Sequence, residues 1–162
     1  MRCRCFRRFK EDNSIYDLRF TIYARLAEAQ DAMKRQLIIT NEPIDEAALI
    51  AARAMTAGMG AAVYFTGAVR GTEEGATIQA IEYETFQRMA EHQFGLLFDE
   101  MEKRWPVESV RLVHRIGMVK VNEPSLWVEV IAPHRGEAFA ACQWLIDEMK
   151  RVVPIWKKPV IK

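Results

Sequence analysis

Two lysines seven residues apart, Lys150 and Lys157, could place two positive charges at one site. Pro154 between them is expected to end a helix, and Trp156 is expected to be buried and to pin the returning chain. The second ammonium group would then come back towards the first. Two cations held close together lower each other's pKa, so either lysine could serve as an acid or a base near neutral pH.

Lys150 lies beside the apolar stripe of a helix that is expected over residues 136–153. About 20° separates Lys150 from Phe139 around the helix axis. The stripe is expected to consist of Phe139, Cys142, Ile146, Met149 and Val153. Lys150 either carries a functional charge or lays its stem along the core while its ammonium group reaches water. The pattern alone leaves both interpretations open.

Two further basic segments could bind an anion. Arg70 ends an apolar strand in which Gly67 lets the backbone approach a ligand, and an arginine there can hold a phosphate through two parallel hydrogen bonds. His134 and Arg135 precede the long helix, whose first backbone N–H groups favour anions. Each segment could instead carry ordinary surface charges. His114, on an apolar strand face, is interpreted as structural.

Arg135 and Lys150 are fifteen residues apart on what is expected to be one helix, which separates them by about 22 Å. They cannot readily share one small-molecule pocket within one chain. If both are functional, the simplest hypothesis is a two-fold dimer. Each site would then combine Lys150 of one chain with His134 and Arg135 of the other.

The elements that must position these residues alternate between strands and helices. Strands are expected at 36–40, 61–69, 77–84, 109–116 and 126–132. Helices are expected from Asn41 or Asp45 to residue 57, at 87–105 and at 136–153. A polar loop is expected at 71–76 and a further helix at 16–32. The order indicates an α+β fold, a single domain with a mostly antiparallel sheet and helices packed against it.

The composition is that of one globular domain, with 162 residues, 50% of them hydrophobic, and a net charge of +1. A nucleic-acid binder would carry a large basic excess, which disfavours an RNA- or phosphate-binding module that uses the basic ends. No apolar run approaches the roughly 20 residues of a membrane span, and no signal peptide follows Met1. We therefore expect neither nucleic acid nor a membrane as a partner.

Cysteine and histidine usage indicates a reducing compartment and no metal. Cys3 and Cys5 are too close for an ordinary disulfide and Cys142 falls in a helical pattern, which fits a cytoplasmic protein. The histidines have no cysteine or carboxylate cluster beside them, so neither a metal site nor a cofactor is expected.

Several segments together resemble the large, catalytic subunit of molybdopterin synthase (the MoaE family). They occur in family order and spacing over about residues 35–158, and several motifs in register are more specific than any one alone. The segments are Tyr64–Arg70, Ile81–Glu84 with Met89 and Ala90, Arg104–Pro106, His114–Gly117, His134 and Arg135 with Ala138 and Phe139, and Lys150–Lys158.

The resemblance implies an α/β hammerhead fold and a sulfurtransferase of molybdenum cofactor biosynthesis. Such an enzyme builds the dithiolene of molybdopterin from cyclic pyranopterin monophosphate. The sulfur arrives as a thiocarboxylate on the C-terminal Gly-Gly tail of a small ubiquitin-like subunit. A central homodimer of large subunits carries one small subunit at each end, which makes a heterotetramer.

Carried over motif by motif, the resemblance implies the roles of eight residues. Lys150 and Lys157 look like the catalytic lysines. The substrate-binding residues are Arg70 with the backbone of Ala68 and Val69, Lys158, and His134 and Arg135 contributed by the neighbouring chain.

Both ends of the sequence depart from the family pattern. The family usually continues past the second lysine with an acidic residue and a segment containing Gly and Trp, whereas Pro159 follows here and Lys162 is the last residue. The alternative is therefore a shortened, non-catalytic partner-binding subunit of the same assembly. Residues 1–32 match no family segment and are expected to be a poorly ordered extension of a domain over 33–162.

Overall fold

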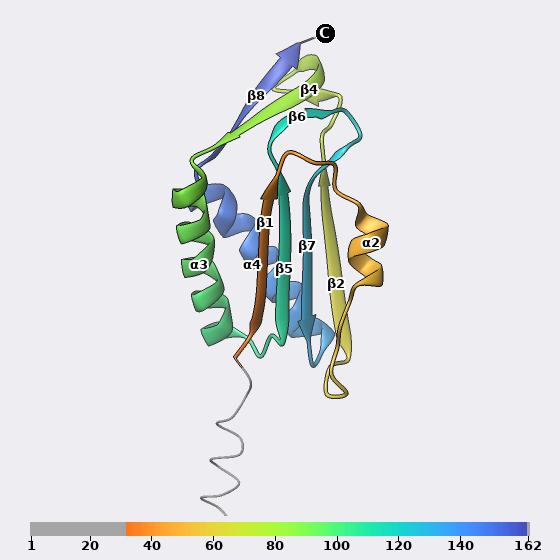
Figure 1. The fold of residues 1–162 in the computed structure, drawn as a ribbon, viewed down its shortest axis with the longest axis vertical. Helices are drawn as coiled ribbons and strands as arrows, with labels where there is room; N and C mark the ends of the chain where they lie inside the picture. The colour runs from red at the N-terminus through yellow and green to blue at the C-terminus, as the bar shows by residue number, and fades with distance from the viewer. Residues whose placement is uncertain (1–31, 162) are drawn as a thin grey trace, which may run out of the picture. The chain divides into compact units, whose positions relative to one another are not determined.

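A computed structural model describes residues 32–161, which form two β-sheets and three α-helices (Figure 1). The helix expected at 16–32 and the poorly ordered extension lie outside the described residues. The elements are β1 (Lys34–Thr40), α2 (Glu46–Ala51), β2 (Ala61–Ala68), β3 (Thr72–Glu73), β4 (Ala76–Thr85), α3 (Gln87–Arg104), β5 (Ser109–Arg115), β6 (Gly117–Lys120), β7 (Pro124–Ala132), α4 (Arg135–Val152) and β8 (Ile155–Ile161). The predicted α+β class is confirmed. No helix of the described part combines the length and hydrophobicity needed to cross a membrane.

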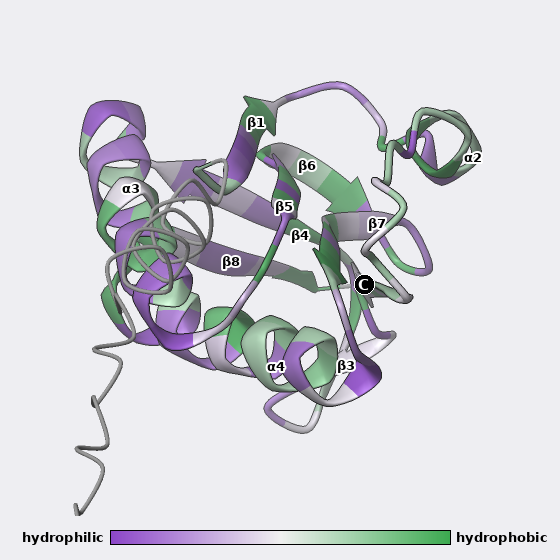
Figure 2. Ribbon diagram, turned by 90° about the horizontal axis from the view of Figure 1, so that it is seen from below, coloured by the Kyte–Doolittle hydropathy of each residue, from purple (hydrophilic) through white to green (hydrophobic). Residues whose placement is uncertain are grey.

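The first sheet has the strand order β1-β5-β7-β2, and only the β1–β5 pair is parallel. Alternate residues of β5 and β7, such as Leu112 and Val128, join Phe94 of α3 and Leu145 of α4 in the main core. Figure 2 shows α3 and α4 on one side of these strands and α2 on the other. Each fully buried side chain of this size contributes about 1.5–3 kcal/mol.

The second sheet is built around β4. It pairs with β6 and β8, and near its start with β3. In Figure 1 its strands lie beyond the upper ends of the first sheet. The chain passes from β5 to β6 through Gly117, whose φ of 75° lies in the left-handed region that favours glycine. The strand expected at 109–116 is therefore β5, and β6 of the second sheet begins only two residues after β5 ends.

Three strands and one helix boundary differ from the sequence expectations. β3, β6 and β8 were not expected, because β3 and β6 are short and β8 contains Pro159. A proline is tolerated here because β8 pairs only with β4 in the described chain and so lies at a sheet edge. The helix expected from Asn41 or Asp45 to residue 57 is only Glu46–Ala51, and beyond it the backbone N–H of Thr56 donates to the Glu108 carboxylate at 3.2 Å rather than to a helix carbonyl.

Two aromatic side chains expected in the core are exposed instead. Phe139 is 63% exposed and Trp156 is 56% exposed. The buried face of α4 is made by Ala138, Ala141, Cys142, Leu145, Ile146 and Met149. Small residues at the start of this face let the helix approach the sheet, and Phe139 lies one position, or about 100°, away from it. Trp156 lies on β8, and its side chain extends from the sheet into solvent.

A buried ion pair stabilises the face of the first sheet opposite α3 and α4. Arg111 Nε donates to Glu129 Oε1 at 2.6 Å, and Arg111 Nη2 donates to Glu129 Oε2 at 2.8 Å and to the Leu49 carbonyl at 2.7 Å. The Glu129 side chain is 1% exposed. The two parallel bonds satisfy a carboxylate that would otherwise be buried without a partner.

Removing Arg111 should show how much stability is lost when the Glu129 carboxylate is buried without a partner. We expect Arg111→Met to lower the free energy of unfolding by about 3–5 kcal/mol, because it leaves the Glu129 charge buried and unpaired. Urea titration followed by circular dichroism measures the loss. Arg151→Met is the matched control, since Arg151 Nη1 also lies 2.6 Å from a carboxylate (Glu148) but its side chain is 70% exposed. Equal losses in the two variants would contradict this account.

His114 is a second buried polar group, and it makes stability depend on pH. Its Nδ1 donates to the Arg115 carbonyl at 2.9 Å, yet burial is the larger effect and lowers the pKa of His114 below its usual value. Above about pH 6.5 the imidazole is neutral in both the folded and the unfolded chain. As the pH falls below that value the unfolded chain binds the proton first, so the free energy of unfolding decreases.

We therefore expect urea titrations to show a loss of stability between about pH 8 and about pH 5.5 that His114→Gln reduces. His92→Gln, which changes an exposed histidine of α3, should leave the loss unchanged. The same pH dependence in wild type and His114→Gln would show that another group titrates.

Candidate functional site

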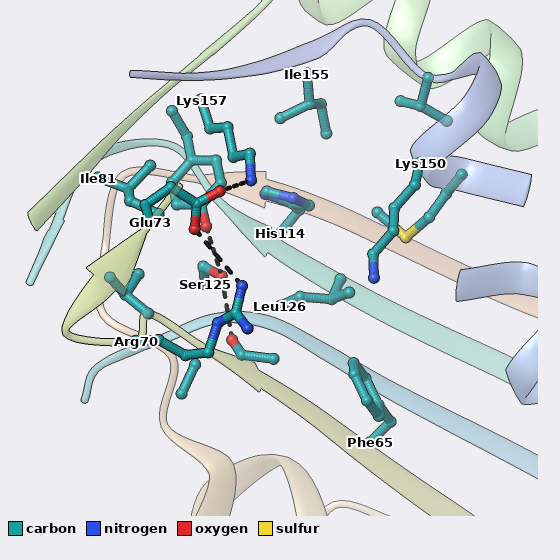
Figure 3. Close-up of a pocket in the computed structure, with 16 residues that line it drawn as sticks. Phe65, Arg70, Glu73, Ile81, His114, Ser125, Leu126, Lys150, Ile155 and Lys157 are labelled. Carbon is teal, nitrogen blue, oxygen red and sulfur yellow. Dashed lines mark hydrogen bonds and ion pairs between the residues drawn. The ribbon is translucent and has the colours of Figure 1, made fainter. Parts of the chain in front are cut away.

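A cavity of about 630 Å³ is lined by residues from both sheets and from the C-terminal end of α4 (Figure 3). Its wall combines apolar side chains with three cationic ones. The lining residues are Phe65, Gly67, Ala68, Val69, Arg70, Glu73, Ile81, Tyr83, His114, Ser125, Leu126, Met149, Lys150, Val153, Ile155 and Lys157. Among residues 32–161, no three His, Cys, Asp or Glu side chains gather as a metal site requires.

Five of the eight residues expected to form the site line this cavity. Ala68, Val69 and Arg70 come from the end of β2 and the segment after it, Lys150 from the last turn of α4, and Lys157 from β8. Figure 3 shows the two lysine side chains entering the cavity from these two elements. The chain returns after α4, as expected, but the pairing of β8 with β4 directs it rather than a buried tryptophan.

An acid that the sequence did not indicate lies among these cations. The Glu73 carboxylate accepts a hydrogen bond from the Lys157 ammonium group, and its second oxygen lies 3.6 Å from Arg70 Nη2. The bond from Lys157 lowers the pKa of Glu73, although desolvation acts in the opposite direction. Lys157 therefore faces a carboxylate rather than a second cation. Lys150 makes no ion pair within the described chain.

A chain of hydrogen bonds fixes the cavity wall near the end of β2. The Tyr83 hydroxyl donates to Ser125 Oγ at 3.3 Å, and Ser125 Oγ donates to the Gly67 carbonyl at 3.1 Å. The His114 ring packs edge-on against Tyr83, with 5.5 Å between the ring centres. His114 is thus both buried, as expected, and part of the cavity wall. Tyr83 and Ser125 were missed, because nothing local in the sequence links the strands that carry them.

The backbone around Gly67 brings Arg70 to the cavity. The pairing of β2 with β7 shifts register between Gly67 and Ala68, and a Cβ atom at Gly67 would lie 3.3 Å from Leu126 Cβ. Beyond the shift, the Val69 N–H donates to the Glu123 carbonyl at 3.1 Å, and the Val69 carbonyl accepts from Asn122 N–H at 2.8 Å. The Val69 backbone is therefore already paired, so Val69 shapes the wall rather than offering a free amide.

Three of the expected site residues do not line the cavity. His134 and Arg135 are exposed at the N-terminal end of α4, about 22 Å along the helix from Lys150. Lys158 follows Lys157 on β8 and is absent from the lining. Its ammonium group lies 2.5 Å from Glu84 Oε1, and that bond raises the pKa of Lys158. One chain alone thus assembles only part of the expected set.

The charges and the shape of the cavity favour a partly apolar anion. Arg70, Lys150 and Lys157 outnumber the single lining carboxylate, so the described wall carries a net positive charge. Apolar side chains of the same lining, such as Phe65 and Leu126, can pack against a flat ring. A volume of this size suits a small molecule.

Known proteins match both the sequence and the fold. The MoaE protein family model matches residues 39–152. The molybdopterin synthase catalytic subunit of Staphylococcus carnosus is 43% identical over 101 residues, which make up 62% of this chain and 67% of that protein. The crystal structure of molybdopterin synthase from Staphylococcus aureus has a TM-score of 0.69 at 33% identity and covers 78% of this chain and 90% of that one.

A more distant likeness shows the fold alone. The complex of subunits 1 and 2 of molybdopterin-converting factor from Helicobacter pylori contains a chain with a TM-score of 0.64 at 22% identity, which covers 78% of this chain and 84% of that one. The family model spans most of the described residues and includes Arg70 and Lys150. The chain therefore belongs to the MoaE family of molybdopterin synthase catalytic subunits, which are enzymes.

Proposed function

We propose that this chain transfers sulfur to cyclic pyranopterin monophosphate and so forms molybdopterin. The sulfur donor is the C-terminal thiocarboxylate of a small ubiquitin-like subunit, which enters the cavity as an extended tail. One observation carries the proposal: Arg70, Lys150 and Lys157 converge on one partly apolar cavity. A pterin monophosphate has a flat ring for the apolar wall and an anionic phosphate for the cations.

The phosphate is assigned to Arg70 and the adjoining wall at Ala68 and Val69. The guanidinium group of Arg70 is largely free of the protein, since its side chain is 79% exposed and its nearest carboxylate oxygen is 3.6 Å away. Two parallel N–H groups of an arginine match two phosphate oxygens. Lys158 is assigned a supporting role at the rim, which requires it to leave Glu84.

The two lysines are assigned to the transfer step. The thiocarboxylate sulfur attacks an electrophilic carbon of the pterin side chain, so that a C–S bond forms while an oxygen leaves with a proton. Water then hydrolyses the resulting thioester, which leaves the sulfur on the pterin and a carboxylate on the small subunit, and negative charge develops on oxygen in both steps. An ammonium group fixed at that position stabilises the charge and can donate a proton to the leaving oxygen. Lys150 suits this task because no acid of the described chain is paired with it. Two such transfers complete one product.

His134 and Arg135 are assigned to the cavity of the neighbouring chain in a homodimer. The length of α4 keeps them from Lys150 of their own chain. In a two-fold dimer each chain can complete the site of the other. The small subunit then binds at each end of the dimer.

The first experiment is single-turnover conversion of the pterin precursor with thiocarboxylated small subunit. We expect Lys150→Ala and Lys157→Ala each to slow product formation by about 10²–10³-fold, the usual cost of losing a group that stabilises developing charge. Arg151→Ala, which removes a neighbouring cation that pairs with Glu148, should retain the wild-type rate. Binding of the small subunit without product in the wild-type chain would instead identify a non-catalytic partner-binding subunit.

The second experiment tests the shared site by mixing inactive variants. Lys150→Ala mixed with Arg135→Ala should recover about a quarter of wild-type activity after subunit exchange, because half of the dimers are mixed and each has one intact site of two. Lys150→Ala mixed with Lys157→Ala should recover none, since both lysines come from the same chain. Recovery in neither mixture would place the complete site within one chain.

A further inference from the structure

The Glu73 carboxylate lies between two cations of the cavity, Arg70 and Lys157. It is the one acid among the lining residues in the described chain. One carboxylate oxygen meets the Lys157 ammonium group and the other faces the Arg70 guanidinium group. The Glu73 side chain is 9% exposed, whereas those of Lys157 and Arg70 are 52% and 79% exposed. The carboxylate therefore lies inside the site while its partners reach solvent.

A tight turn directs this carboxylate inward. Glu73 pairs with Ala76 across the β3–β4 hairpin, and the two residues between them, Glu74 and Gly75, have φ of 50° and 85°. Positive φ at both positions is the signature of the type I′ turn, which fixes strand direction closely. Because side chains alternate along a strand, neighbouring Thr72 turns outward and Glu73 turns towards the cavity.

The pairing has a direct consequence for ligand binding. An anion that bridges Arg70 and Lys157 must first displace Glu73 from Lys157. A monoanion that does so only replaces one negative charge by another and gains little. A dianion, such as a phosphate monoester near neutral pH, adds a further charge and gains net attraction.

We propose that Glu73 is a resident counter-anion of Arg70 and Lys157 that keeps monoanions from bridging these two cations and gives way only to a dianion. Lys150, which has no acid paired with it in the described chain, stays open to a monoanion such as a thiocarboxylate. Glu73 also keeps Lys157 directed inward while the site is empty. The proposal rests on the proposed function only for the identity of the dianion, the phosphate of the pterin. The proposed role of Glu73 concerns anion binding and can be tested without catalytic turnover.

The test is isothermal titration of the full chain with inorganic phosphate at about pH 8, where phosphate is a dianion, and with acetate as the monoanion. Glu73→Gln keeps the shape of the side chain and removes its charge. We expect it to bind phosphate about tenfold more tightly than wild type and also to bind acetate more tightly than wild type. Glu73→Asp, which restores the charge, should return the acetate affinity to the wild-type value.

Glu74→Gln is the matched control. It removes the same charge from the same turn, but Glu74 is exposed and outside the cavity lining, so both affinities should stay at the wild-type value. Circular dichroism checks that each variant folds, and Glu73→Thr, which suits a strand, replaces Glu73→Gln if the latter does not. A folded neutral variant that binds phosphate no more tightly than wild type would overturn the proposal, because Glu73 would then only join β3 to β8.

The same variants separate this proposal from the function proposed above. In the sulfur-transfer assay, Glu73→Gln should lower KM for the pterin precursor and make acetate a competitive inhibitor. If no variant forms product while Glu73→Gln still gains anion affinity, the sulfur-transfer assignment fails and the counter-anion stands. If product forms but neither anion affinity nor KM responds to Glu73→Gln, the counter-anion proposal fails and the sulfur-transfer assignment stands.

Discussion

The antiparallel pairing of β4 with β8 is the interaction on which the candidate site depends. α4 carries Lys150 to the cavity, but Lys157 lies beyond Pro154, where nothing local fixes its direction. The register places Lys157 opposite Tyr83, so that both side chains line the cavity, and the next residue, Lys158, faces away from it. Because side chains alternate along a strand, a slip of one residue would exchange the two lysines. The site is therefore held by backbone pairing between segments whose partner residues are 70 to 83 positions apart in sequence.

The cations of the cavity wall attract an anion, but they also repel one another. Arg70 and Lys157 share the Glu73 carboxylate, which reduces their mutual repulsion while the site is empty. Lys150 has no such partner in the described chain and stands against apolar side chains on α4. Its positive charge is therefore the one most available to an incoming anion. Hydrogen bonds through Ser125 fix the cavity wall near the end of β2. That part of the site is therefore already ordered before a ligand binds.

Local patterns predicted the helices and the long strands, and the family resemblance predicted which residues matter. The rise of an α-helix was enough to place Arg135 far from Lys150, a separation that α4 confirms. The patterns failed where long-range pairing decides the structure. β8 contains a proline and two lysines and does not resemble a strand in isolation, and Trp156 was taken for core because of its type. Glu73 could not have been predicted, because its contact with Lys157 spans 84 positions and depends on both β3 and β8.

A short step in the chain joins the two sheets. β5 of the first sheet ends at Arg115 and β6 of the second begins at Gly117, which has a left-handed φ of 75°, with Ile116 between the two strands. His114 and Tyr83, on either side of this junction, are both in the cavity wall. The backbone conformation at Gly117 is therefore one of the constraints on how the two sheets meet at the cavity. A residue with a Cβ atom there would be strained by about 1–3 kcal/mol, and relieving that strain would change the dimensions of the site without altering any side chain that lines it.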